Sequence, residues 1–352
     1  MDNRPDVSCS PTPECRMGKK TVKMGVVGLG KFGEQHARVL SQLPHVELVG
    51  VCSRSQDRSK EIAERYDVPK SYTSHEVMLR DSDFDAVDIV TEVDRHAEIA
   101  QIAMENGKHV FSEILLSRSL EETDQLIQTA KRNSIHFMVG FLERFDVRRA
   151  QIKKRIEAGE MGELVSLYSR RNIWRGILDA PRFKSFPLIL QPGIHTIDQL
   201  LWLAQDEVKE VYARSRSVVD TDRADTWWAT LTFKNGLVGV IEQSFFVPDS
   251  RLSWCDVHLE VVGTEGTAKI SEPGDSAWYW NTDATRSPDL FLAPELHGRV
   301  TGALEAELSY FADCVIENRP PELGTLEQAK KNLDAGLAIM ASAERNEIIR
   351  LS

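Results

Sequence analysis

The chain has 352 residues, of which 41% are hydrophobic, so it is too long for one small core and fits two domains of ordinary size. Its 43 basic and 54 acidic residues give a net charge of -11 at pH 7, which repels nucleic-acid phosphates and anionic membrane surfaces. We therefore expect neither nucleic acid nor a membrane as a partner.

The five cysteines are scattered and form no CxxC pair, so the sequence predicts neither a zinc site nor a disulfide framework. We expect a cytoplasmic protein that holds no metal. Residues 1–20 are polar and proline-rich and lack the apolar core of a secretory signal, which predicts a disordered tail.

From Lys23 onward, short apolar runs alternate with segments of helical periodicity. The first run, "KMGVVGLG", ends in glycine, as a strand buried on both faces of a sheet does. Further strands are predicted at 46–52, at 85–91, in "KHVFSE" and in "HFMVGF", with helices at about 56–66, 95–106 and 119–133. This alternation predicts a doubly wound parallel sheet over residues 21–143.

After about residue 145 the pattern changes to long alternating strands, which predicts a second, mostly antiparallel α+β domain over residues 144–352. A helix at 146–159 leads into it, Asn235-Gly236 predicts a tight hairpin, and a helix at 193–205 interrupts the strands. The strands are predicted at 163–174, 208–218, 226–234, 237–247 and 254–263. Two closing helices, at roughly 301–317 and 326–344, are expected to pack back on the first domain.

A GxGxxG motif directly follows the first strand and opens a helix. At this place the glycines allow a tight turn, close approach of the backbone to a pyrophosphate and close packing of helix on strand. The motif therefore predicts dinucleotide binding, and the alternative is a glycine-rich turn that has lost its ligand. The cofactor-binding residues predicted here are Gly28, Leu29, Gly30, Lys31, Phe32 and Gly33.

The second strand ends at Ser53 and Arg54, where an acid would bind the adenosine ribose of NAD. A hydroxyl and a guanidinium suit a 2′-phosphate, which favours NADP slightly over NAD. The alternatives are that Arg54 stacks on adenine or that Asp57 reaches the ribose.

His195 and Asp198 are three residues apart and therefore neighbours on the helix at 193–205. Pro192-Gly193 places His195 in the first turn, where the helix dipole disfavours imidazolium and keeps a neutral base available. This pattern is consistent with a catalytic base and a supporting carboxylate, and equally with a histidine satisfied by a structural neighbour.

Together the GxGxxG motif, "TEVDRHAEIAQIAMENGKHVFSE", "MVGFLERFD" and "GIHTID" resemble the Gfo/Idh/MocA family of NAD(P)-dependent sugar and cyclitol dehydrogenases, over about residues 22 to 351. The resemblance implies a Rossmann domain, an open-faced sheet domain, and dimers or tetramers formed through that sheet. It also implies transfer of hydride from a hydroxyl carbon to the nicotinamide while a histidine takes the hydroxyl proton.

Carried over residue by residue, the resemblance makes His195 and Asp198 catalytic. It places Thr91, His96 and Glu113 beside the cofactor. The chain departs from the family's E-K-P and aspartate positions, since Ile114 and Leu115 replace lysine and proline, and Gln191 stands where many members have aspartate.

Lys184 could supply the missing ammonium, although a solvated loop lysine is the plainer interpretation. We assign Ile114, Arg144, Arg171 and Gln191, with His195, to substrate binding. For Arg171, a charged solvent edge or a subunit contact is the alternative.

The leading hypothesis is an NAD(P)-dependent dehydrogenase or reductase that acts on a CH-OH group of a sugar, sugar acid or cyclitol. A second keeps the cofactor but makes the reaction a redox-neutral elimination or isomerisation through transient oxidation. A third is a sugar- or cofactor-sensing regulator without catalysis.

Overall fold

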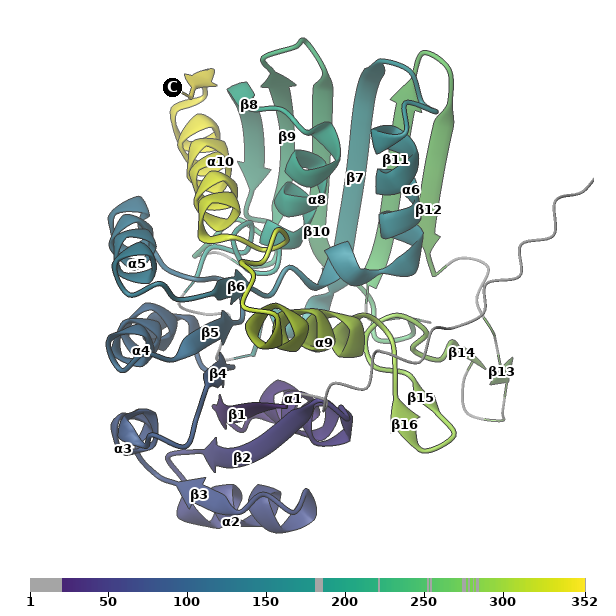
Figure 1. Cartoon of the computed structure of the whole chain (residues 1–352). Helices are drawn as coiled ribbons and strands as arrows, with labels where there is room; N and C mark the ends of the chain where they lie inside the picture. The colour runs from purple at the N-terminus through teal and green to yellow at the C-terminus, as the bar shows by residue number, and fades with distance from the viewer. Residues whose placement is uncertain are drawn as a thin grey trace, which may run out of the picture.

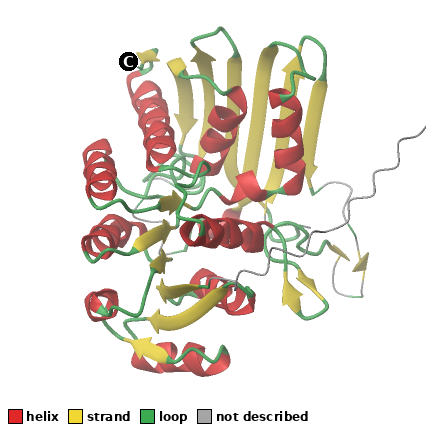
Figure 2. Ribbon diagram, viewed as in Figure 1, coloured by secondary structure: helices red, strands yellow, loops and turns green. Residues whose placement is uncertain are grey.

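The structure is a computed structural model, and it describes residues 21–180, 186–220, 222–251, 253, 255–273, 277, 279–280, 282 and 285–351. Within these residues the chain forms two sheets, each with helices packed on it (Figures 1 and 2). The last helices return to the first sheet, so the two halves share part of their cores.

The first sheet has the strand order β3-β2-β1-β4-β5-β6, and all of its neighbouring pairs are parallel. This is the order of a Rossmann fold, in which ligands bind at the carboxyl ends of the strands, where the order reverses between β1 and β4. The strands are β1 (Val22–Val27), β2 (Val46–Cys52), β3 (Lys70–Tyr72), β4 (Ala86–Ile89), β5 (His109–Ser112) and β6 (Phe137–Val139).

Amphipathic helices follow each of the first five strands and cover both faces of this sheet. Ser55, Ser74 and Ser119 begin three of them, each accepting a backbone hydrogen bond from the first turn. The helices are α1 (Lys31–Gln42), α2 (Gln56–Arg65), α3 (His75–Arg80), α4 (Val93–Glu105) and α5 (Leu120–Arg132).

The second sheet has the strand order β12-β11-β7-β10-β9-β8-β17 and is antiparallel except for the pair β7 and β10. Gly236, with φ of +94°, closes the hairpin between β9 and β10, as the sequence predicts. The strands are β7 (Leu164–Trp174), β8 (Val208–Arg216), β9 (Thr226–Phe233), β10 (Val238–Val247), β11 (Cys255–Gly263), β12 (Thr267–Glu272) and β17 (Ile349–Arg350).

Helices α6 (Val147–Glu157), α8 (Ile194–Ala204) and α10 (Leu326–Arg345) cover one face of the second sheet, and within the described residues the other face carries no helix (Figure 1). A short helix, η1 (Leu142–Phe145), connects β6 to α6, and η2 (Arg175–Ile177) follows β7. Four two-residue strands form small hairpins: β13 (Tyr279–Trp280) with β14 (Thr285–Arg286), and β15 (Glu295–Leu296) with β16 (Arg299–Val300). The helices of this part are α6 (Val147–Glu157), α8 (Ile194–Ala204), α9 (Ala303–Ile316) and α10 (Leu326–Arg345).

Helix α9 belongs to the core of the first sheet although it comes late in the chain. Its apolar side chains share one core with β1, α1 and β2, and the Phe311 and Phe111 rings lie 5.8 Å apart. The apolar residues that this segment contributes are Val300, Ala303, Leu304, Leu308, Phe311 and Ala312.

The predicted fold class, a doubly wound parallel sheet followed by a mostly antiparallel sheet domain, is confirmed. The predicted strand at 46–52 has the observed bounds, and most other predicted elements differ at their ends by one to three residues. Four elements, β3, α3, β12 and β17, were not predicted, because they are short or border on turns. In the described part of the chain, no helix is long and apolar enough to cross a membrane.

Candidate active site

The glycine-rich turn lies at the carboxyl end of β1, between β1 and α1. Gly28 has φ of +101°, and a Cβ there would collide with the Val90 carbonyl oxygen. A Cβ at Gly33 would collide with the Gly28 carbonyl oxygen, so both positions require glycine for packing. At Gly30, by contrast, no atom lies within 4 Å of where a Cβ would be, and the turn is open toward solvent.

The N-terminus of α1 opens at this turn without a side-chain cap, so its backbone N–H groups are available to an anion. Lys31 is exposed at the first position of the helix, and Phe32 is half-buried. Leu29 is buried and its carbonyl oxygen accepts a hydrogen bond of 3.0 Å from Arg58 Nε. A dinucleotide pyrophosphate fits this turn, because its backbone is exposed where the phosphates would approach.

Ser53 and Arg54 lie at the end of β2, next to the same edge. The Arg54 side chain is 91% exposed and pairs with Glu92 at 3.1 Å, while the Ser53 hydroxyl accepts a hydrogen bond from Ser55 N. Glu92 therefore brings a carboxylate to the position where the sequence predicts a 2′-phosphate.

His96 holds together the loops that follow β4 and β5. Its ring nitrogens lie 2.8 Å from the Leu115 carbonyl oxygen and 3.0 Å from that of Thr91. The ring is 1% exposed, and burial lowers its pKa, so the neutral imidazole donates to one carbonyl at a time. His96 thus holds Thr91 in place from inside the protein. Thr91 lies just after β4, at the edge of the sheet formed by the carboxyl ends of its strands.

Glu113 directly follows β5, and its side chain is buried in the protein. Its Oε2 accepts a hydrogen bond of 3.2 Å from Ile114 N, and its Oε1 lies 3.5 Å from His36 Nε2. Gly140 packs against the same carboxylate, since a Cβ there would lie 2.8 Å from Glu113 Oε1. The side chain is 11% exposed.

Ile114 lines a small enclosed cavity between the loop after β5 and the beginning of α8. Ile194, the residue before His195, lines the same cavity, so the structure brings the loop and the start of α8 together. The surroundings are almost entirely apolar and include Leu115, Leu116, Val139, Phe141, Ala329 and Leu333, with Ser117 and Thr123.

His195 lies in the first turn of α8 and is partly buried. Among the residues that the structure describes, none forms a hydrogen bond with its ring. Burial and the positive charges of Arg171 and Arg149 lower its pKa to about 3. The imidazole is therefore neutral at physiological pH and able to accept a proton.

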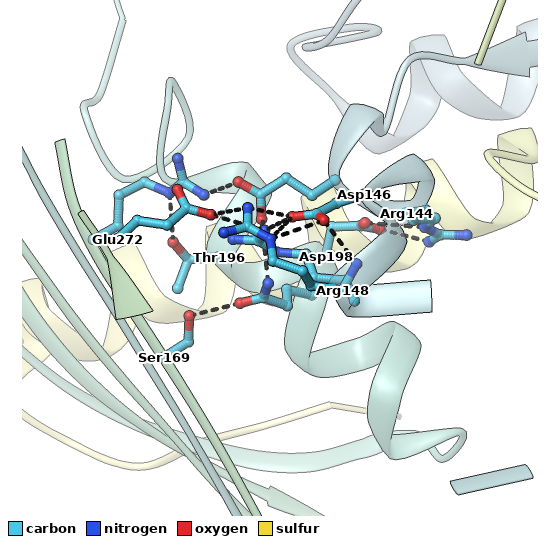
Figure 3. Close-up of polar contacts among 11 residues, drawn as sticks. Arg144, Asp146, Arg148, Ser169, Thr196, Asp198 and Glu272 are labelled. Atoms are coloured by element: carbon cyan, nitrogen blue, oxygen red, sulfur yellow. Dashed lines mark hydrogen bonds and ion pairs between the residues drawn. The ribbon is translucent and has the colours of Figure 1, made fainter. Parts of the chain in front are cut away.

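Arg171 does not face an open sheet surface. It lies on the helix-covered face of β7, is 4% exposed, and forms an ion pair with Glu143 of η1 and a hydrogen bond of 3.4 Å with Thr196 (Figure 3). Arg149 joins the same network through Asp146 and Glu143. Arg171 therefore acts on His195 through its charge from inside the protein.

Asp198 faces Arg144 rather than His195. The Arg144 guanidinium donates to both carboxylate oxygens, from Nη2 at 2.5 Å and Nε at 3.0 Å, and Asn332 Nδ2 donates to Oδ1 at 2.6 Å (Figure 3). Arg144 is 4% exposed and Asp198 1%. From the sequence we predicted that Arg144 binds substrate and that Asp198 is catalytic. In the structure both side chains are engaged in this bidentate ion pair.

Of two further predicted site residues, the structure describes Gln191 but not Lys184. Gln191 is half-buried just before α8, and its Oε1 is buried without a hydrogen-bond partner among the described residues. It is therefore free to bind a polar group. Lys184 lies outside the described residues, and its role stays a prediction.

Sequence reasoning missed three buried ionisable residues that the structure places behind the glycine-rich turn: His36, Asp88 and Glu307. Each interrupts an apolar stripe, His36 among Ala37 and Leu40 of α1 and Glu307 among Leu304 and Leu308 of α9. A charged residue at a core position of a helix or strand was the available signal.

Comparison with known proteins shows which family the chain belongs to. Residues 22–141 match an oxidoreductase family with an NAD-binding Rossmann fold, and residues 153–351 match the C-terminal alpha/beta domain of that family. The chain is thus an oxidoreductase by fold and sequence, and an NAD(P) cofactor is supported. It belongs to the Gfo/Idh/MocA family.

Two relatives from Bacillus subtilis match most of the chain. The uncharacterized oxidoreductase YrbE is 31% identical, over 85% of this chain and 88% of the relative. The scyllo-inositol 2-dehydrogenase (NAD(+)) is 29% identical, over 94% and 96%. A crystal structure of a probable dehydrogenase from Thermotoga maritima has a TM-score of 0.81 at 26% identity, over 94% of this chain and 98% of that one.

From its buried ion pair with Arg144 we predict that Asp198 stabilises the fold. Asp198→Asn should lower the free energy of unfolding by about 3–5 kcal/mol, because it leaves the Arg144 guanidinium buried without a counter-charge. Urea titration measures this loss. The double variant Arg144→Met, Asp198→Leu should recover most of it, since no charge is left buried. A normal stability with reduced turnover in Asp198→Asn would support a catalytic role instead.

Proposed function

We propose that the protein is an NAD-dependent dehydrogenase that oxidises a hydroxyl group of a cyclitol, with His195 as the general base. The observation that carries the proposal is the neutral His195 at the start of α8, beside the loop that follows β5 at the cofactor edge. The substrate class rests on relatives whose names specify inositol, including a myo-inositol 2-dehydrogenase from Thermotoga maritima, 28% identical over 94% of this chain.

In this mechanism the bound nicotinamide would accept hydride from the alcohol carbon. His195 takes the hydroxyl proton at the ring nitrogen that faces the substrate. Within the described residues, neither ring nitrogen forms a hydrogen bond with another protein group. Burial and the charges of Arg171 and Arg149 make imidazolium unstable, so His195 releases the proton to solvent rather than keeping it. The same charges favour a developing alkoxide next to the ring. Ile114 gives the substrate an apolar neighbour at the position where the family resemblance leads us to expect lysine.

We propose NAD in place of NADP as the cofactor, reversing the slight preference drawn from Ser53 and Arg54. Two observations support NAD: the name of the scyllo-inositol relative, and the Glu92 carboxylate paired with Arg54. Glu92 would repel a 2′-phosphate and occupy the guanidinium that could bind it.

His195→Ala should lower kcat by about 10²–10⁴ with NAD and an inositol, the range for loss of a general base. Because the His195 pKa is lowered to about 3, kcat/KM of the wild type should show no step from this residue near pH 6.5. His45→Ala is the control and should keep the wild-type rate. His45 directly precedes β2, at the amino end of the strand and thus away from the carboxyl ends where the cofactor would bind. An unchanged rate in His195→Ala would exclude it as the base.

The cofactor proposal is tested by kcat/KM with NAD and with NADP. The wild type should prefer NAD. Glu92→Gln should raise kcat/KM with NADP by about two- to fivefold, because it frees Arg54 from an exposed ion pair. Glu98→Gln is the control, since Glu98 lies exposed on α4, the helix that begins after Glu92. It should leave the ratio of kcat/KM with NADP to kcat/KM with NAD unchanged. A wild-type preference for NADP would contradict the proposal.

We also propose that the helix-free face of the second sheet forms a contact between subunits in a dimer or tetramer. Large side chains point outward from this face, including Trp228, which is 45% exposed, and Tyr212, which is 39% exposed. A wide sheet face with exposed aromatic groups is a typical site of association.

Trp228→Glu should dissociate the oligomer, because it places a charge in the apolar contact, whereas Val147→Glu, an exposed position at the start of α6, should not. Analytical ultracentrifugation reads the mass of each variant. A monomeric wild type would refute the contact.

A further inference from the structure

Four ionisable side chains form a buried cluster between the glycine-rich turn and α9. We name it the acid cluster: His36 of α1, Asp88 of β4, Glu113 after β5 and Glu307 of α9. His36, Asp88 and Glu307 are 0% exposed and Glu113 is 8% exposed. The proposed reaction uses none of them.

Most polar atoms of the acid cluster lack a partner. His36 Nδ1 lies 2.8 Å from Asp88 Oδ2, and His36 Nε2 lies 3.5 Å from Glu113 Oε1. Asp88 Oδ1, Glu113 Oε1 and both carboxylate oxygens of Glu307 form no hydrogen bond with the described residues. A buried carboxylate is costly as a charged group when no donor satisfies its oxygens, so these unpartnered atoms favour protonated carboxylic acids in the cluster.

The charges lead to the same result. The cluster holds three carboxylates and one imidazole, and Arg144, whose charge acts on Glu307, is already paired with Asp198. A buried carboxylate without a counter-charge takes up a proton rather than staying ionised. Within the described residues, no group of three or more His, Cys, Asp or Glu is arranged to hold a metal ion that would replace the proton.

The two glutamates differ in how firmly they hold a proton. Burial raises the pKa of Glu307 well above its usual range, the charges of Glu113 and Asp88 raise it further, and Arg144 and Asp198 act in opposite directions with smaller effect. Burial also raises the pKa of Glu113, to about 7, with His36 opposing the rise and Asp88 adding to it. For His36, burial lowers the pKa, but Asp88 and Glu113 raise it overall. Glu307 therefore stays neutral at pH 7, and the His36–Glu113 pair is the part that titrates.

The acid cluster contacts the cofactor edge from behind. The His36 ring packs edge-on against Phe32 of the glycine-rich turn, with ring centroids 4.6 Å apart. Glu113 directly follows β5, which lies on the β4 side of the reversal between β1 and β4. In a Rossmann fold the adenosine lies on the other side, at β2. The nicotinamide half of a dinucleotide would lie on the β4 side, and its ring carries a positive charge only in the oxidised form.

We propose that Glu113 binds a proton in the cofactor-free protein and releases it to solvent when the oxidised cofactor binds. The protonated protein and NAD⁺ give the complex and one free proton, and no bond of the cofactor changes. The positive ring favours the carboxylate of Glu113, whereas NADH has no ring charge and leaves the proton in place. Glu307 stays protonated throughout and so limits the site to one exchangeable proton. This inference rests on the proposed function, since it requires that NAD binds.

Calorimetric titration of NAD⁺ and NADH at pH 7, in two buffers with different ionisation enthalpies, tests the proposal. The heat of NAD⁺ binding should depend on the buffer and correspond to release of a fraction of one proton per subunit, and that of NADH should not. The Kd for NAD⁺ should fall as the pH rises from 6 to 8, by at most about tenfold per pH unit, the limit for one linked proton. Buffer-independent heat for NAD⁺ would overturn the inference, while absence of binding by both nucleotides would overturn the proposed function with it.

Two matched variants locate the proton. Glu113→Gln should bind NAD⁺ without proton release. Glu307→Gln imitates the neutral form of its residue and should keep the release. Persistent release in a folded Glu113→Gln variant would overturn the assignment. If Glu113→Gln does not fold, difference infrared spectra of the wild type and of Glu307→Gln test the assignment. In both proteins NAD⁺ should remove the carbonyl band of a protonated carboxylic acid. A band that NAD⁺ leaves unchanged would overturn the proposal.

Discussion

The geometry of the active site depends on the buried ion pair of Arg144 and Asp198. It connects η1, which leaves the first sheet, to α8, which carries His195, and Asn332 extends the connection to α10. A buried pair stabilises a protein little, because desolvation of two charges offsets most of their attraction. Its bidentate geometry does fix one orientation of α8, the helix whose first turn carries His195.

A second charge network adjusts the chemistry of the residue that the ion pair positions. Glu143, Arg149 and Arg171 lie on the other side of α8, and the two arginines add to burial in lowering the pKa of His195. The protein thus uses buried arginines where the family resemblance leads us to expect a lysine in contact with substrate. Positive charge thus reaches His195 from inside the protein, while the cavity at Ile114 is lined mainly by apolar side chains.

The sequence predicted the fold because the apolar runs and glycines act locally. The positions of Gly28 and Gly33 follow from backbone contacts that any side chain would block, and such requirements are visible in a motif. Alternation along β7 correctly separated Arg171 from Arg170, but it could not tell which face the helices cover. Asp198 was recognised as a neighbour of His195 on the helix, whereas its partner is 54 residues away in sequence, and no local pattern encodes such a pairing.

The late position of α9 has a consequence for biosynthesis. The nucleotide-binding sheet lacks the apolar surface of Leu304, Leu308 and Phe311 until this helix has been made. At ordinary rates of translation, the interval between β1 and α9 is on the order of tens of seconds. During that time the nascent chain exposes an incomplete core, so the first half cannot fold to its final state ahead of the second, and a chaperone has a defined surface to protect on the ribosome.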